Sequence, residues 1–401
     1  MKKLISFLTI GVLASTLSGC FQEPVPPIVE KKPVKTTEKP VEKEAPQPEP
    51  MTATITGSGD MLYHDTLYWA ANTGNGYDFT INFTGIKDLI SRVDLALGDF
   101  EGTIRPDRPL SGYPLFNAPP ETANAIKDAG FDAVDLAHNH ILDMGIPGLL
   151  STKQTFENVG VSTFGVRASK DEPILIKEIN GIKIAVVGFA YGFNGLEQNL
   201  SADEYATHMA DLDPETVKAT LEKAEAEADV TVVFPQMGVE YALEPVPEKV
   251  ELYHQMIEWG ADVIFGGHPH VIQPTEKVVK DGAEKFIIYS MGNLISDQRL
   301  ETVDNIWTER GVITEVGLSK LPGEKTIITM VKAHPTWVAK VPNGRSYNGF
   351  PLHDYTTYLT EDFLPGGRFE NLFDTATVQR IRTADQEVHN LLKLPEFGTQ
   401  K

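Results

Sequence analysis

Apolar and polar positions along the chain follow two alternating patterns. Short apolar runs typical of buried strands are separated by segments in which apolar residues recur at helical spacing. We expect strands at 52–57, 93–97, 133–136, 230–234, 261–265 and 286–289. We expect helices at 119–129, 148–159, 213–228 and 247–259. This alternation predicts an α/β fold.

Other stretches depart from this alternation. Asn180-Gly181 joins two β-prone runs, 173–179 and 182–188, which predicts a hairpin. Beyond residue 300 the pattern weakens to β runs at 311–318 and 326–332, and a helix is expected at 376–393.

The first twenty residues have the pattern of a secretory signal. A basic start precedes an apolar stretch that ends in Leu17-Ser18-Gly19-Cys20, a match to the bacterial lipobox. We expect cleavage before Cys20, lipid on its sulfur, and an extracytoplasmic protein anchored to the cell membrane. Residues 21–50, rich in proline and charge, predict an extended tether. The main domain is then expected at 51–340, with a C-terminal extension at 341–401.

Composition excludes several classes of function. Acidic residues number 56 against 35 basic ones, and the formal net charge is -21. This balance argues against nucleic acid and against charge-driven docking on an anionic membrane. It should also repel a polyanionic substrate unless bound metal reverses the local potential. Cys20 is the only cysteine, so no disulfide can form within one chain and no thiolate metal site is expected.

Two histidine clusters follow predicted strands. His138-Asn139-His140 comes after the run at 133–136, with Asp143 close behind, and His268-Pro269-His270 comes after the run at 261–265. The first cluster alone could be a polar loop with a satisfied histidine. Four of the ten histidines at two strand ends, however, favour facing walls of one site at the carboxyl edge of a sheet.

Carboxylates follow the first two predicted strands in the same way. Asp60 comes directly after the run at 52–57, where a rigid strand can fix a metal ligand. Asp99 and Glu101 follow the next run and alternate along an extended chain, so their side chains are expected on one side. Taken alone, Gly59-Asp60 is only a turn signal.

The order of these motifs resembles the CapA family, the poly-gamma-glutamate capsule synthesis proteins of the calcineurin-like metallophosphatase superfamily. The similarity covers residues 52 to 337. Its motifs are Gly59-Asp60, Glu101-Gly102-Thr103, Phe116-Asn117-Ala118-Pro119, Asn139-His140 with Asp143 and Gly145, Gly238 with Glu240-Tyr241, His268-Pro269-His270-Val271 and Tyr289-Ser290-Met291-Gly292-Asn293. The resemblance implies a four-layer α/β/β/α sandwich with a metal site at the carboxyl ends of its strands.

The resemblance also implies roles for individual residues. The implied metal ligands are Asp60, Glu101, Asn139, Gln236, His268 and His270. Oxygen and imidazole ligands suit one or two ions of Mn, Zn or Fe, which would hold a phosphate oxygen and activate water. His140 would donate a proton to the leaving group, with Asp143 or Asp99 as the acid beside it.

Three positions depart from the family pattern. Leu62 stands where metallophosphatases usually have histidine. Gln236 stands where the family usually has histidine, and its amide binds first-row metals more weakly than imidazole, which predicts a weak or missing second ion. Asp99 and His138 replace asparagines of the family and add possible ligands.

Two functions of different classes agree with these observations. The first is a metal-dependent, phosphoesterase-like hydrolase acting on a phosphoester in the synthesis or anchoring of poly-gamma-glutamate or a related surface polymer. The second is a non-catalytic, membrane-tethered assembly or binding factor for an anionic polymer. Membrane synthase or export proteins are the expected partners in either case, and a fold serving only as a scaffold is a third alternative.

Overall fold

The computed structural model describes residue 27 and residues 49–398. The chain divides into two compact units, Met1–Gln47 and Pro48–Lys401, and every strand and helix assigned within the described residues belongs to the second unit. The expected signal segment, the lipidation site Cys20 and nearly all of the expected tether lie outside the described residues.

Eight strands form the first sheet. Its order is β14 (Phe350–Leu359), β13 (Ile327–Tyr347), β12 (Arg310–Lys320), β1 (Met51–Leu62), β2 (Leu95–Glu101), β3 (Ala133–Asp135) and β4 (Ser162–Phe164), with β11 (Asn293–Ile295) paired to β1. Strands β1 to β4 are parallel neighbours, whereas β12, β13 and β14 pair antiparallel. The carboxyl ends of β1, β2 and β3 therefore meet at one edge.

Six strands form the second sheet. Its order is β5 (Leu175–Ile179), β6 (Ile182–Ala190), β7 (Val230–Gln236), β8 (Val263–Phe265), β10 (Ala283–Met291) and β9 (Ile272–Lys280). Strands β6, β7, β8 and β10 run parallel. The predicted hairpin is confirmed, because β5 and β6 pair antiparallel across Asn180 and Gly181, whose φ angles of 51° and 86° fit a type I′ turn.

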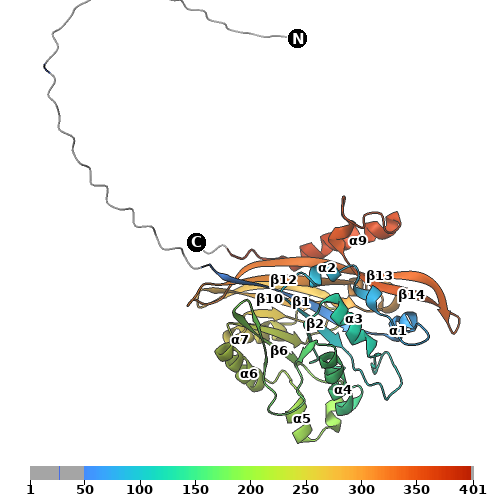
Figure 1. Cartoon of the computed structure of the whole chain (residues 1–401), viewed down its shortest axis with the longest axis horizontal. Coiled ribbons are helices and arrows are strands. Elements are labelled where there is room, and N and C mark those ends of the chain that lie inside the picture. Colours follow the sequence, from blue (N-terminus) through green and yellow to red (C-terminus); the bar gives the residue numbers. More distant parts are fainter. Residues whose placement is uncertain (1–26, 28–48, 399–401) are drawn as a thin grey trace, which may run out of the picture. The chain divides into compact units, whose positions relative to one another are not determined.

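Apolar side chains hold the two sheets together and attach helices to their outer faces. Ile55 and Leu97 of the first sheet share one buried cluster with Phe265 of the second. Helices α3 (Glu121–Ala129) and α4 (Gly145–Asn158) contribute to a cluster on the outer face of the eight-stranded sheet. Helices α6 (Pro214–Glu227) and α7 (Pro247–Glu258) cover the six-stranded sheet (Figure 1). The predicted mixed α/β fold with two sheets is confirmed.

The C-terminal helix α9 (Thr375–Leu392) forms where the apolar spacing predicted it. It contacts β13 and β9, and Val388 and Leu392 join the core between the sheets (Figure 1). Strand β13 runs through the expected boundary at residue 340. It is much longer than the apolar run at 326–332, because its exposed second half pairs with β14.

Shorter elements connect these layers. They are α1 (Asp65–Ala71), α2 (Lys87–Ile90), α5 (Ala202–His208), α8 (Leu300–Val303) and the 3₁₀ turns η1 (Thr80–Phe83), η2 (Leu196–Asn199), η3 (Ile306–Glu309) and η4 (Thr360–Phe363). In the described part of the chain, no helix combines the length and the apolar character needed to cross a bilayer.

Candidate metal centre

Three predicted ligands from three strand ends converge. Asp60 lies near the end of β1, Glu101 ends β2, and His270 lies in the loop after β8. One ligand atom from each residue can be chosen so that all three lie within 4.8 Å of one another. His270 Nδ1 is 2.9 Å from Asp60 Oδ2 and 3.8 Å from Glu101 Oε2. All three residues are buried. The loop after β8 therefore faces the carboxylates at the ends of β1 and β2.

The oxygens of this group fit a cation. Asp60 Oδ1 and both carboxylate oxygens of Glu101 are buried and have no hydrogen-bond partner among the described residues. A buried carboxylate without partners is costly, and native proteins pair such groups or use them to coordinate metal. Two carboxylates and one imidazole are also a donor set suited to Mn²⁺, Fe²⁺ or Zn²⁺. The residues present thus fit the divalent ion that the sequence predicted.

The pKa shifts in the group show how strongly its charges interact. Burial raises the pKa of Glu101 to about 7, and the charge of His270 opposes this. Burial alone would lower the pKa of His270, but the charges of Glu101 and Asp60 and the hydrogen bond to Asp60 raise it to about 9. Asp60 and Glu101 therefore keep the His270 imidazolium as a positively charged partner. A divalent ion would balance their charge more effectively.

Asp99 lies against Asp60. The two are register neighbours on β2 and β1, and burial, followed by the charge of Asp60, raises the pKa of Asp99. A Cβ atom at Gly267 would be 3.3 Å from Asp60 Oδ1 and 3.5 Å from Asp99 Oδ2. The absence of a side chain at Gly267 lets the loop after β8 approach the acids of the other sheet.

The second histidine loop has an unusual backbone. His268 and His270 have φ angles of 88° and 57°, a region that residues other than glycine rarely adopt. Such outliers are concentrated at functional sites, where the surrounding structure compensates the strain. The loop thus turns sharply enough to present two imidazoles within three residues.

His268 lies beside the three-ligand group without belonging to it. Its ring centre is 6.0 Å from that of His270 and 4.6 Å from that of Tyr191. Its Nδ1 is buried and has no hydrogen-bond partner among the described residues. Burial and the charge of His270 lower the pKa of His268 to about 3, so its imidazole is neutral, the form that binds metals.

Asn139 and Gln236 face each other across the two sheets. The backbone N–H of Asn139 donates to Gln236 Oε1 at 2.8 Å, and Gln236 Nε2 donates to Asn139 Oδ1 at 3.2 Å. Both amides are therefore engaged with each other. Asn139 and Gln236 therefore offer a metal ion fewer uncommitted ligand atoms than Asp60, Glu101 and His270 do.

His140 and Asp143 form a hydrogen-bonded pair. His140 Nδ1 is 2.8 Å from Asp143 Oδ2, which also accepts the backbone N–H of Phe116 at 2.6 Å. Burial would lower the pKa of His140, but the hydrogen bond to Asp143 and the charges of Glu101 and Asp143 raise it. Of the two acids considered for this role, Asp143 contacts His140, whereas Asp99 lies against Asp60.

Sequence reasoning missed several residues of the site. Asn194 Oδ1 accepts from Asn139 Nδ2 at 3.2 Å, and Asn194 Nδ2 lies 3.4 Å from His140 Nδ1. Asn293 Oδ1 lies 3.1 Å from His270 Nδ1. Their positions in the chain could have identified them, because Tyr191 and Asn194 follow β6 and Asn293 begins β11 shortly after β10 ends. His138, considered as an added ligand, is fully buried, and its ring nitrogens lie within hydrogen-bond distance of the backbone N–H groups of Gly102 and His140.

Comparison with known proteins identifies the family. The family model described as bacterial capsule synthesis protein PGA_cap matches residues 54–298, more than half of the chain. The chain belongs to this family. The chain is 29% identical over 239 residues to the capsule biosynthesis protein CapA of Bacillus anthracis, covering 56% of each chain.

Two further comparisons extend this finding. The PGA biosynthesis protein CapA of Bacillus subtilis is 32% identical over 181 residues, which are 44% of this chain and 46% of that one. The chain thus spans about half the length of these curated relatives. Among solved structures, the sulfate thiohydrolase SoxB of Thermus thermophilus covers 74% of this chain and 43% of its own, with a TM-score of 0.37 and 14% identity.

Proposed function

We propose that this protein is a metal-dependent hydrolase of phosphoesterase type that acts in the synthesis or anchoring of a capsule polymer. The observation that carries the proposal is the convergence of Asp60, Glu101 and His270, with buried carboxylate oxygens that no described residue satisfies. Membership in the capsule synthesis family supports the polymer context. The relatives' names supply poly-gamma-glutamate as the first polymer to test.

Asp60, Glu101 and His270 would hold the ion, and His268 lies beside them. When bound, the ion supplies polarisation of a phosphoryl oxygen and activation of water. With a formal net charge of -21, the chain repels polyanions, so this positive charge would also serve to admit an anionic substrate.

His140 is the proton donor in this proposal. Asp143 accepts a hydrogen bond from Nδ1–H, which fixes the ring orientation. The proton on Nε2 then remains for transfer to the leaving oxygen. The Phe116 ring packs edge-on against the imidazole, with ring centres 4.7 Å apart, and limits its rotation. The raised pKa of His140 increases the fraction that carries the transferable proton.

The cellular setting belongs to the same proposal. A lipid on Cys20 and the tether at 21–50 would hold the folded unit outside the cell membrane, within reach of a growing surface polymer. Membrane synthase or export proteins are then the proposed partners.

The first test is the metal content of the compact unit 48–401, purified without chelator and measured by mass spectrometry beside the His268→Ala/His270→Ala variant. We expect near-stoichiometric Mn, Fe or Zn in the wild type and little in the variant. A wild-type protein that stays empty after metal is supplied would contradict the proposal.

Catalysis is tested separately with an aryl phosphate ester and Mn²⁺. We expect turnover, and we expect His140→Ala to lower kcat by about 10²- to 10⁴-fold. Metal content should not change, because His140 is outside the three-ligand group. Equal turnover in the two proteins would remove His140 from the mechanism.

The Asn139–Gln236 pair favours a second candidate, a non-catalytic assembly factor, because it engages the amides expected at a second ion. This candidate predicts that gene deletion disturbs polymer display, whereas His140→Ala in cells leaves display intact. If the point variant reproduces the deletion, the assembly role without catalysis is wrong.

A further inference from the structure

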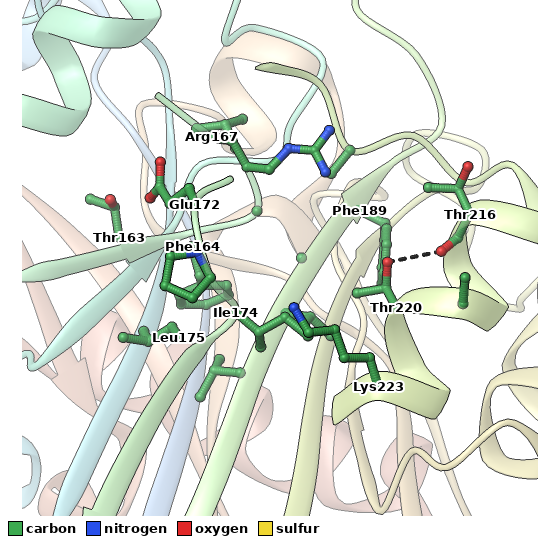
Figure 2. Close-up of a pocket in the computed structure, with 18 of the residues that line it drawn as sticks. Thr163, Phe164, Arg167, Glu172, Ile174, Leu175, Phe189, Thr216, Thr220 and Lys223 are labelled. Carbon is green, nitrogen blue, oxygen red and sulfur yellow. Dashed lines mark hydrogen bonds between the residues drawn. The ribbon is translucent and has the colours of Figure 1, made fainter. Parts of the chain in front are cut away.

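A cavity of about 330 Å³, lined by none of the metal-centre residues, lies between α6 and the adjoining edges of the two sheets. Residues at the end of β4, in the segment between β4 and β5, along β6 and on the more exposed face of α6 line it (Figure 2). Its volume falls at the lower end of the range of about 300–1,000 Å³ typical of small-molecule sites.

The buried part of the cavity wall is largely apolar. Phe164, Val186 and Phe189 are almost fully buried, and Ile174 and Leu175 are half-buried. The nearby hydroxyl groups are committed to the protein, since Thr220 Oγ1 donates to the carbonyl oxygen of Thr216 at 2.8 Å. The cavity therefore favours a ligand with an aliphatic or aromatic body.

The charge around the cavity is opposite in sign to that of the whole chain. Arg167, Lys170 and Lys223 line it, and Glu172 is the one acidic residue among its lining residues. Glu172 is paired with Lys153 at 2.5 Å. In a chain with a formal net charge of -21, a cluster of cations around an apolar cavity is unusual.

Two of these cations are already engaged. Lys170 forms an ion pair with Asp203. Arg167 donates to the carbonyl oxygens of Ala206, Thr207 and Met209. Lys223 makes no hydrogen bond or ion pair with the described residues, and Figure 2 shows its side chain extending from α6 across the cavity toward Ile174.

We propose that this cavity binds a carboxylate carried on a short aliphatic body, with Lys223 as the anion-binding group. A single unpaired ammonium group matches a monoanion, and the buried walls match the methylene groups next to it. A single-headed aliphatic acid has this chemistry, whereas a γ-linked glutamate chain, with a free carboxylate on every residue, does not.

The site shares no residue with the metal centre, although it lies close to it. Gly165 and Gly188 line the cavity, and a Cβ atom at either position would be within 2.2 Å of Asp135 Oδ1. Asp135 is the register neighbour of Asp99. Asp135 thus lies between the cavity lining and Asp99, and binding in the cavity does not depend on the hydrolase proposal.

Calorimetric titration of the purified full chain with octanoate and with γ-linked triglutamate tests the proposal. We expect saturable binding of octanoate at one site per chain and no saturable binding of triglutamate. The same binding is expected in the His268→Ala/His270→Ala protein, which separates this site from the metal centre. Binding of octanoate alone would support a single-headed aliphatic acid as the ligand, whereas binding of triglutamate alone would overturn the proposal.

Three variants on α6 decide the location. Lys223→Gln should weaken binding about tenfold, the loss expected for one charge-assisted hydrogen bond. Ala219→Trp places a large side chain at the lining of the cavity from an exposed position and should abolish binding. Lys218→Gln removes an exposed lysine of the same helix that pairs with Glu222, and should leave affinity unchanged. Binding of neither probe, or equal affinity in all three variants, would overturn the proposal.

Discussion

Two buried glutamates of this protein have opposite surroundings. Glu309, in η3, accepts from Trp337 Nε1, from Arg380 Nε and Nη2, and from Arg299 Nη2, at 2.5 to 3.3 Å. Glu101, at the end of β2, is buried to the same extent, but neither of its oxygens has a hydrogen-bond partner among the described residues. The same residue type at the same depth is satisfied in one place and unsatisfied in the other.

The difference separates a structural carboxylate from a ligand-binding one. The donors to Glu309 come from α9, β13 and the segment before α8, so its charge joins the C-terminal helix to the sheet. Glu101 faces Asp60 and His270 and joins no elements by hydrogen bonds. Satisfied buried charges hold a fold together once they are formed, whereas unsatisfied ones cost stability that a bound ion returns.

The largest expected effect is on stability, at Glu309, whose carboxylate is fully hydrogen-bonded. Glu309→Gln keeps the shape of the side chain but leaves the Arg299 and Arg380 guanidinium groups without their shared carboxylate. We expect the free energy of unfolding to fall by about 3–4 kcal/mol, toward the lower end of the range for buried pairs because Arg380 keeps part of its hydration. Denaturant unfolding monitored by circular dichroism measures this.

Glu301→Gln is the matched control. Glu301 pairs with the same two arginines but its side chain is 54% exposed, so we expect a loss below about 1 kcal/mol. If the two variants lose equal stability, the burial of Glu309 is not what makes its ion pairs strong.

The next largest expected effect is on metal affinity, at Glu101. Glu101→Gln should leave the unfolding free energy of the metal-free protein unchanged or raise it, because it removes a buried charge that accepts no hydrogen bond from the described residues. It should weaken metal binding by about 100-fold or more, since even indirect partners of a ligand are worth about 10- to 100-fold. Equilibrium dialysis with Mn²⁺ measures the affinity.

Glu240→Gln provides the comparison for this variant, because Glu240 is exposed and its charge reaches His270 from outside the three-ligand group. We expect it to retain most of the affinity. Metal binding that survives Glu101→Gln but not Glu240→Gln would place the ion elsewhere.

The smallest expected effect is on the pH dependence of stability, and it comes from a buried lysine. Lys249, on α7, donates to the carbonyl oxygen of Met237 at 2.7 Å and to Gln273 Oε1 at 3.2 Å, both neutral acceptors. Burial lowers its pKa from 10.5 to about 7, and the charge of Asp60 opposes this. The folded protein therefore releases this proton at a lower pH than the unfolded chain does.

The sign of the pH dependence follows from this shift. Between pH 7 and 10.5 the unfolded state binds the extra proton, so the stability of the wild type rises with pH relative to Lys249→Met. We expect the difference in unfolding free energy to change by about 2 kcal/mol between pH 7 and pH 9. A difference that stays constant over this interval would show that Lys249 is protonated in both states.

Strand ends and histidine spacing predicted much of the site. Asp60, Glu101 and His270 were predicted as ligands from the residues at strand ends and from family resemblance, and the fold brings them together. The choice of Asp143 over Asp99 beside His140 was open, because Asp143 is three residues from His140 in the chain, whereas Asp99 follows another predicted strand whose end could lie at the same edge. The pairing of Gln236 with Asn139 could not be predicted, because their contact spans 97 residues and depends on how the two sheets pack.

The sequence by itself determined the alternation of strands and helices, the hairpin at Asn180-Gly181 and the two histidine loops, because these depend on local periodicity and on backbone preferences of a few residues. The tertiary structure alone decided which polar atoms find partners. Glu309 accepts hydrogen bonds from two arginines and a tryptophan of distant elements, whereas Glu101 accepts none from the described residues. Partner choice for a buried charge is a long-range property, set by the packing of one sheet on the other and of α9 on β13.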